Sequence, residues 1–114
     1  MAEKPFAAPA IQDEIREIVH RIVSRFNPEK IILFGSHARG NAGPDSDVDL
    51  LIVMDVIGSK RQTATAIDMA LLGIDLPVDV IVLKPEEVER NRHMMGTIVY
   101  PALREGKVLY ERRA

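Results

Sequence analysis

Three aspartates are the residues of this chain whose type and spacing could do chemistry. Asp47 and Asp49 lie two positions apart in the apolar segment SDVDLLIV, and Asp79 lies in the segment PVDVIV. Residues i and i+2 of a strand share a face, roughly 6.6 Å apart at ~3.3 Å per residue. We therefore expect the first two carboxylates to project together while Val48 and Leu50 face the core.

The apolar residues around Asp79 show the same alternation. Val78, Val80 and Val82 would share one face of a strand, so Asp79 interrupts the other face. If this strand lies beside the strand that carries Asp49, three carboxylates converge on one surface. A single aspartate in a strand is as often a strand-end or salt-bridge residue, but three in this arrangement favour a functional site.

A cluster of three carboxylates is electrostatically unfavourable, because its members repel one another unless cations lie between them. Oxygen-only ligands suit a hard divalent ion such as Mg²⁺ or Mn²⁺, and Mg²⁺ usually completes its shell with water and phosphate oxygens. Three aspartates could hold two such ions ~3.5–4 Å apart, an arrangement that clamps an in-line phosphoryl displacement. The pattern therefore predicts a site for two Mg²⁺ ions, with Mn²⁺ as a possible substitute.

The segment GSHARG places a Gly-Ser pair directly after an apolar stretch. Gly35 permits a ligand to approach the backbone closely, and Ser36 would begin a short helix whose free N–H groups attract anions. Arg39 either contacts phosphate oxygens, which its guanidinium matches, or forms an ion pair with Asp45 or Asp47. A turn with a serine cap would explain the Gly-Ser pair alone. Beside a two-metal site, the pair indicates a nucleoside triphosphate pocket.

Three other interpretations of this segment fail on its residues. A calcium loop that starts at Asp45 would need glycine and glutamate where the chain has Leu50 and Val56. A P-loop would end in Gly-Lys-Ser/Thr, and the sequence contains no such triplet. A phosphatase with a phosphorylated aspartate would carry its Asp-x-Asp pair after a hydrophobic strand, whereas here the pair begins one.

The elements that must position these residues can be predicted from apolar periodicity. Apolar residues at steps of three and four predict a helix over residues 11–26, which Asn27-Pro28 ends. Short apolar segments bounded by turn residues predict strands over 30–34, 48–54 and 78–83. The remaining predictions are a helical turn over 36–39, helices over 60–72, from Pro85 and over 97–105, and an edge strand over 107–110.

Length and composition describe one globular domain. The chain has 114 residues, of which 46% are hydrophobic and 28% charged, enough to bury a substantial core. We expect residues 1–10 to form a flexible N-terminal arm and residues 11–114 to form a single domain. Its fold class is predicted to be α/β (α+β), with a small mixed sheet of three or four strands flanked by helices.

The bulk properties also exclude several classes of protein. A net charge of −2 favours neither nucleic acid nor an anionic membrane, and two tyrosines give no set of stacking residues, so we expect no direct nucleic-acid binding. Without cysteine there is neither a disulfide framework nor a thiolate metal site. The longest apolar runs fall far short of the ~20 residues of a membrane span, and the N-terminus lacks a signal-peptide core. We expect a soluble cytoplasmic protein.

GSHARG followed by SDVDLLIV resembles the signature of the DNA polymerase β nucleotidyltransferase superfamily, and most of all the minimal nucleotidyltransferases (MNT type) of bacteria and archaea. The resemblance spans about residues 11–111 and implies a polymerase-β-like palm. It implies that Gly35 and Ser36 hold the triphosphate and that Asp47 and Asp49 bind both metal ions. It further implies that Asp79 completes the catalytic ion's ligands and helps to deprotonate an acceptor hydroxyl.

The activity that this resemblance implies is metal-dependent transfer of a nucleoside monophosphate, with AMP from ATP favoured, to an acceptor hydroxyl. The chain leaves little room for recognising the acceptor, so a second chain is expected. The resemblance implies a small all-helical HEPN-type toxin, with this chain as its antitoxin; some family members add AMP to a tyrosine of the toxin. One alternative is a non-catalytic antitoxin that acts by contact alone. Another is an aminoglycoside-type small-molecule nucleotidyltransferase, which the missing acceptor domain disfavours.

Further expectations concern side chains in or near the motif. His37 is the only histidine within GSHARG, and we expect it at the surface, where it could touch the nucleotide. Lys60 and Arg61 are expected to form a solvated helix start rather than to bind phosphate. Met94 and Met95 are expected to pack in the core or in an interface.

Overall fold

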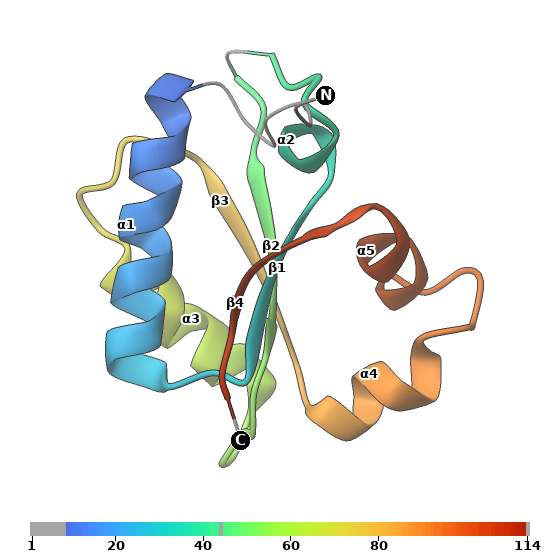
Figure 1. Ribbon diagram of the computed structural model, residues 1–114. Coiled ribbons are helices and arrows are strands. Elements are labelled where there is room, and N and C mark those ends of the chain that lie inside the picture. Colours follow the sequence, from blue (N-terminus) through green and yellow to red (C-terminus); the bar gives the residue numbers. More distant parts are fainter. Residues whose placement is uncertain (1–8, 44, 114) are drawn as a thin grey trace.

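The computed structural model describes residues 9–43 and 45–113. Most of the predicted N-terminal arm, residues 1–8, therefore lies outside the described residues. The elements in chain order are α1 (Pro9–Phe26), β1 (Lys30–Phe34), α2 (Ser36–Arg39), β2 (Val48–Val53), α3 (Lys60–Ala70), β3 (Val78–Leu83), α4 (Pro85–Asn91), α5 (Val99–Glu105) and β4 (Lys107–Glu111) (Figure 1).

The element boundaries follow the predictions closely, with differences of one or two residues at the ends of some helices and of the strands β2 and β4. α1 begins at Pro9, two residues before the predicted start, because proline has a backbone preset for the first helical turn. α3 ends at Ala70, since Leu71 leaves the helical conformation and caps it. α5 begins at Val99 rather than at residue 97, because Thr97 instead closes a turn through hydrogen bonds to the carbonyl of Met94.

The four strands form one mixed sheet in the order β3-β2-β1-β4. β1 pairs antiparallel with both β2 and β4, whereas β2 and β3 run parallel. A parallel pair needs a long crossover connection, and α3 supplies it between these two strands. The predicted fold class, a small mixed sheet flanked by helices, is confirmed.

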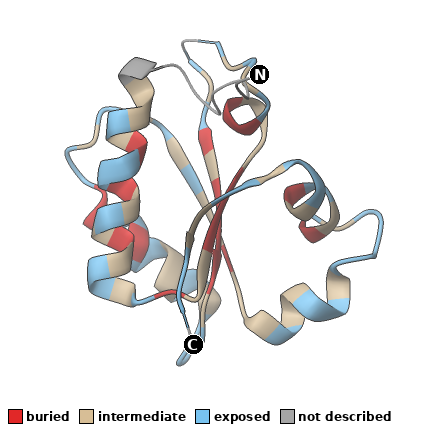
Figure 2. Ribbon diagram, in the orientation of Figure 1, coloured by how far each residue is buried: buried red, intermediate tan, exposed pale blue. Residues whose placement is uncertain are grey.

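Helices cover both faces of the sheet, because the central strands bury alternate side chains on opposite sides (Figure 1). On one face, Ile18 of α1 and Ile67 of α3 share a buried cluster with Leu50 of β2. On the other face, Leu51 of β2 shares a second cluster with Ala102 of α5. Buried residues accordingly follow the sheet and the helix sides that face it (Figure 2).

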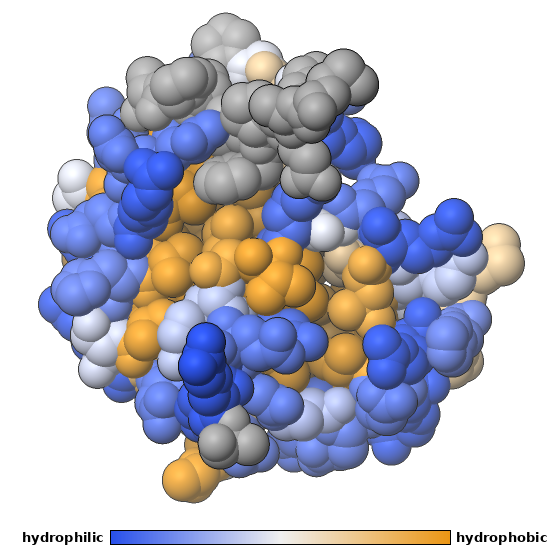
Figure 3. All heavy atoms as spheres, in the orientation of Figure 1, coloured by the Kyte–Doolittle hydropathy of each residue, from blue (hydrophilic) through white to orange (hydrophobic). Residues whose placement is uncertain are grey.

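The surface carries an apolar groove outside the carboxylate-bearing end of the sheet. A shallow apolar groove of about 280 Å³ lies between α1 and the edge strand β4, lined by Ile15, Val19, Val108 and Leu109, and apolar side chains are visible between these elements in Figure 3. Within the described ranges, no helix is both long and apolar enough to cross a membrane.

Candidate active site

Asp49 and Asp79 lie side by side on neighbouring strands. The parallel pairing of β2 and β3 makes them register partners, as it does Val48 and Val78. Neighbouring strands lie about 4.8 Å apart, so the two carboxylates leave the same face of the sheet at close range. Val48 is fully buried in the opposite direction. The predicted alternation is therefore confirmed, and the two aspartate-bearing strands are indeed neighbours.

Asp47 completes the group from the residue position just before β2, where it is exposed. Its influence is visible in the pKa of Asp49, which is raised first by burial, then by the charge of Asp79 and then by that of Asp47. The interactions with His37 and Arg39 act in the opposite direction on that pKa. The three predicted aspartates thus form one electrostatically coupled group.

Asp68 on α3 is a fourth carboxylate that the sequence analysis did not identify. Partial burial and, after it, the charge of Asp79 raise the pKa of Asp68. Since the side chain is exposed overall, the charge of Asp79 is the more informative cause, because it requires the two carboxylates to be near each other. No local pattern marks Asp68, since its position depends on how α3 packs against β3.

Gly35 stands where a larger residue would not fit. Its backbone has φ 75° and ψ −157°, a conformation that is essentially restricted to glycine. A Cβ at this position would collide with the Asp49 carboxylate, which lies against the Gly35 backbone. Ser36 follows as the first residue of α2, and the Gly35 carbonyl accepts the N–H groups of Ala38 and Arg39 at 3.1 Å. The Gly-Ser pair therefore directly adjoins the carboxylate group.

Arg39 forms neither of the two predicted ion pairs. Its Nη1 lies 3.3 Å from Oε2 of Glu105, at the end of α5, and not against Asp45 or Asp47. The expectation of an ion pair with the motif's own aspartates was wrong, because only the folding of α5 onto the sheet brings Glu105 close. Since both side chains are about half exposed, this ion pair leaves the guanidinium accessible to solvent.

His37 is buried, contrary to the expectation of a surface side chain. Its exposed fraction is 1%, and among the described residues it is the one polar residue that is buried. Its Nε2 lies 3.1 Å from the carbonyl oxygen of Ser46, while Nδ1 has no hydrogen-bond partner among the described residues. The single turn of α2 directs His37 and Ala38 inward, a geometry that four residues of sequence do not reveal.

The remaining charged and apolar candidates lie outside the carboxylate group. Lys60 donates to Glu87 Oε2 at 2.6 Å and so is not the freely solvated residue that we expected, whereas Arg61 is exposed as predicted. Met94 and Met95 are 52% and 80% exposed, so they do not pack in the core, and their packing in an interface stays a prediction.

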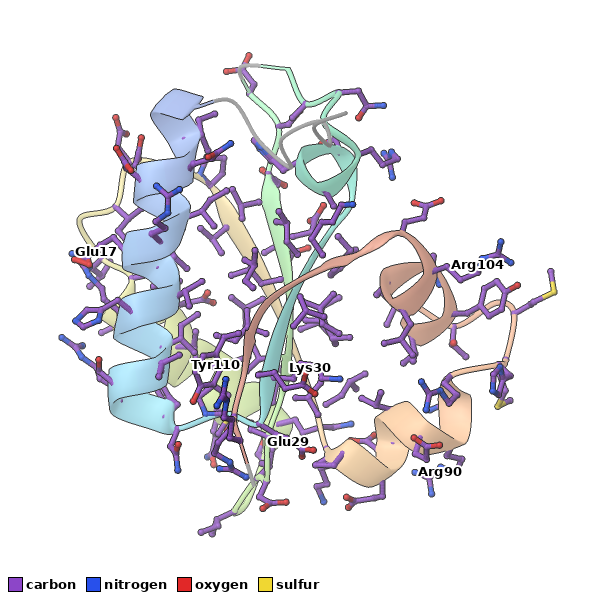
Figure 4. The ribbon with its side chains drawn as sticks, in the orientation of Figure 1. Glu17, Glu29, Lys30, Arg90, Arg104 and Tyr110 are labelled. Atoms are coloured by element: carbon purple, nitrogen blue, oxygen red, sulfur yellow. The ribbon has the colours of Figure 1, made fainter. Side chains whose placement is uncertain are left out.

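Figure 4 places Arg90 on α4 and Arg104 on α5, away from the end of the sheet where β2 and β3 begin. The Arg104 guanidinium lies 5.5 Å from the ring centre of Tyr100, and its Nη1 donates to the Tyr100 hydroxyl at 2.8 Å. These arginines therefore add no positive charge to the carboxylate group.

The donor set fits a divalent cation that arrives with phosphate. Among the described residues, no three His, Cys, Asp or Glu side chains are close enough to hold a metal ion by themselves. Mg²⁺ is nevertheless commonly bound through one or two carboxylates together with substrate phosphates and water. Asp49 and Asp79 would provide such a pair of oxygen ligands, and their mutual repulsion would be relieved by a cation.

Comparison with known proteins decides the family. Residues 13–100 match the nucleotidyltransferase domain family. The chain belongs to this family. A Methanocaldococcus jannaschii protein, named as a candidate protein adenylyltransferase, is 37% identical over 101 residues, which cover 84% of this chain and 94% of that protein.

Solved structures share the fold. A candidate nucleotidyltransferase from Sulfolobus solfataricus superposes with a TM-score of 0.59 at 26% identity, covering 98% of this chain and 93% of that one. The MntA–HpeT toxin–antitoxin complex gives a TM-score of 0.59 at 20% identity, over 86% of this chain and 73% of the other. A toxin–antitoxin crystallised with AMP-PNP gives 0.54 at 20% identity, over 90% and 74%.

This nucleotidyltransferase is a minimal member of the polymerase-β-like group, as its motif implied. The activity of the family is nucleotidyl transfer, and the chain is accordingly an enzyme. GSHARG and SDVDLLIV, the segments that carried the resemblance, both lie within the matched residues.

Proposed function

We propose that this nucleotidyltransferase transfers AMP from Mg²⁺-bound ATP to a hydroxyl group of a partner protein, and that it serves as the antitoxin of a small all-helical HEPN-type toxin. The observation that carries the catalytic part is the side-by-side placement of Asp49 and Asp79 next to Gly35. The similarity to a candidate protein adenylyltransferase supports a protein acceptor. The likeness of fold to two toxin–antitoxin structures, one with AMP-PNP, supports the pairing with a toxin.

The different exposure of the aspartates suggests how they divide the work. Asp49 is half-buried against Gly35, which suits the nucleotide side of the site, with Ser36 and Arg39 near the phosphates. Asp79 is exposed on the edge strand β3, so a hydroxyl from another molecule could reach its carboxylate. Asp79 would accept the proton of that hydroxyl while the hydroxyl oxygen attacks the α-phosphorus of ATP and pyrophosphate leaves.

Asp47, Asp49 and Asp79 would hold the Mg²⁺ ions. Bound there, the ions would neutralise charge on the triphosphate and stabilise the attacking and leaving oxygens. The protein's own part is to position the two reactants, and Gly35 serves this by leaving room for the Asp49 carboxylate to lie against its backbone.

The test is transfer of label from α-³²P-ATP to a short helical partner protein, which this proposal predicts to be encoded by a neighbouring gene. Wild type, Asp49→Asn and the control Asp55→Asn are compared, because Asp55 is an exposed aspartate beyond the opposite end of β2. We expect label on the partner with wild type and the control, and none with Asp49→Asn or with EDTA. Labelling that persists in folded Asp49→Asn would refute the catalytic proposal. Toxin neutralisation by Asp49→Asn without labelling would instead show the contact-only antitoxin.

A further inference from the structure

The buried imidazole of His37 has no role in the proposed chemistry, yet its position is costly. Of the charged and polar side chains in the described ranges, it is the one that is buried, with 1% of its surface exposed. Its Nδ1 has no hydrogen-bond partner there, and leaving a buried polar atom unpaired is unfavourable. An apolar side chain would fill this space without that cost. The reason for a histidine at this position therefore has to lie in its other ring nitrogen, Nε2.

Nε2 of His37 holds the peptide group that leads into Asp47. The Ser46 carbonyl can only accept, so at 3.1 Å it requires that Nε2 carries the proton. On the other side of Asp47, the N–H of Val48 donates to the carbonyl of Pro77 at 2.8 Å. The backbone of Asp47 is thus held at both ends, by His37 of α2 before it and by Pro77, the residue just before β3, after it.

Ser46 is itself part of a tight turn. Its N–H donates to the carbonyl of Gly43 at 3.2 Å, and its hydroxyl accepts the N–H of Gly43 at 2.9 Å. These bonds close the turn locally but do not attach it to the rest of the domain. Among the bonds described for Gly43 and Ser46, the one from His37 makes that attachment.

We propose that His37 is a positioning residue, whose buried Nε2–H holds the Ser46 carbonyl and thereby keeps the Asp47 carboxylate beside Asp49. The inference rests on the proposed function, since it matters only if Asp47 binds the divalent cation. Residues that orient metal ligands in this way typically change metal affinity or activity by roughly 10- to 100-fold when replaced.

Two amide substitutions test which nitrogen matters. In His37→Gln the amide nitrogen is as many bonds from Cα as the imidazole Nε2, so it can still donate to Ser46. In His37→Asn the amide nitrogen takes the place of Nδ1 and falls short of the carbonyl. His37→Leu fills the space without any donor. The readouts are Mn²⁺ binding to the protein in the presence of a non-hydrolysable ATP analogue, by electron paramagnetic resonance, and the Mg²⁺ concentration for half-maximal AMP transfer.

We expect His37→Asn and His37→Leu to weaken Mn²⁺ binding and raise the Mg²⁺ requirement by roughly 10-fold or more, while His37→Gln stays near wild type. Equal Mn²⁺ binding in wild type and His37→Asn would overturn the inference, as would equal weakening in the Gln and Asn variants. If wild type itself neither binds Mn²⁺ nor transfers AMP, the proposed function fails instead.

A measurement on wild type keeps the inference testable even if the variants fail to fold. Nitrogen-15 NMR of the imidazole distinguishes the two neutral tautomers. We expect His37 to be protonated at Nε2 and not at Nδ1. The opposite tautomer would overturn the inference, because Nε2 could not then donate to the Ser46 carbonyl.

Discussion

Asp49 and Asp79 are register partners on adjacent parallel strands, so the fold holds two carboxylates close together although they repel each other. Burial, first, and then this repulsion raise the pKa of Asp49. Such an arrangement costs stability and is retained where a cation or substrate uses the charge. It is the feature around which both function and stability can be tested.

Asp49→Asn should make the protein less active and more stable. Removing the charge abolishes one metal ligand, so we expect AMP transfer to fall by at least about 100-fold. It also relieves the repulsion with Asp79, so the free energy of unfolding should rise by a few tenths to about 1 kcal/mol in metal-free buffer. Urea unfolding and the labelling assay measure both. A loss of stability together with activity would mean that Asp49 supports the fold and not the chemistry.

Gly35→Ala should abolish activity, whereas the control Gly73→Ala should not. Both glycines have positive φ, 75° and 92°, so alanine adds backbone strain of order 1–3 kcal/mol at either position. Only at Gly35 would the new Cβ also strike the Asp49 carboxylate, since nothing lies within 4 Å of it at Gly73. Both variants should therefore unfold at a lower temperature than wild type, whereas only Gly35→Ala should lose AMP transfer. Equal activity in the two variants would show that close approach at Gly35 is unimportant.

Glu105→Gln should strengthen nucleotide binding if Arg39 contacts the triphosphate. The substitution frees the guanidinium from its ion pair at 3.3 Å. Because exposed ion pairs contribute about 1 kcal/mol or less, we expect a gain in ATP affinity of no more than about fivefold by calorimetry. Glu111→Gln, which removes the ion pair with Lys30, is the control and should change nothing. A gain that survives in Arg39→Met/Glu105→Gln would exclude Arg39 as its cause.

Glu87→Gln should remove a pH-dependent part of the stability. Hydrogen bonds from Lys60, first, and from the backbone N–H of Lys84 lower the pKa of Glu87 below its ordinary value of 4.5. The ionised carboxylate therefore stabilises the fold above that value, and this contribution is lost as the pH falls through the lowered pKa.

The expected loss in Glu87→Gln is about 0.5–1 kcal/mol at pH 7, because solvent screens the partly exposed Lys60, and it should shrink toward pH 3. Urea unfolding at both pH values measures it. The exposed neighbour Glu86 provides the control, Glu86→Gln, for which we expect no such change. A difference between wild type and Glu87→Gln that does not vary with pH would contradict this account.

The local patterns of the chain were enough to predict its elements. Apolar steps of three and four located α1, and short apolar segments bounded by turn residues located β2 and β3, with Asp49 and Asp79 interrupting one face of each. Gly35 could be singled out as well, because a glycine between an apolar strand and a helical turn is typical of a backbone that a ligand approaches closely. These features depend on residues close in sequence, whose geometry is set by backbone periodicity.

Contacts between distant segments could not be obtained in this way. Arg39 meets Glu105 across 66 positions, and Asp68 approaches Asp79 only because α3 packs on β3. His37 was expected at the surface, and its burial depends on how one helical turn lies between the sheet and the turn at Ser46. Sequence periodicity determines which face a side chain occupies, whereas the partner on that face is chosen by the packing of the whole domain.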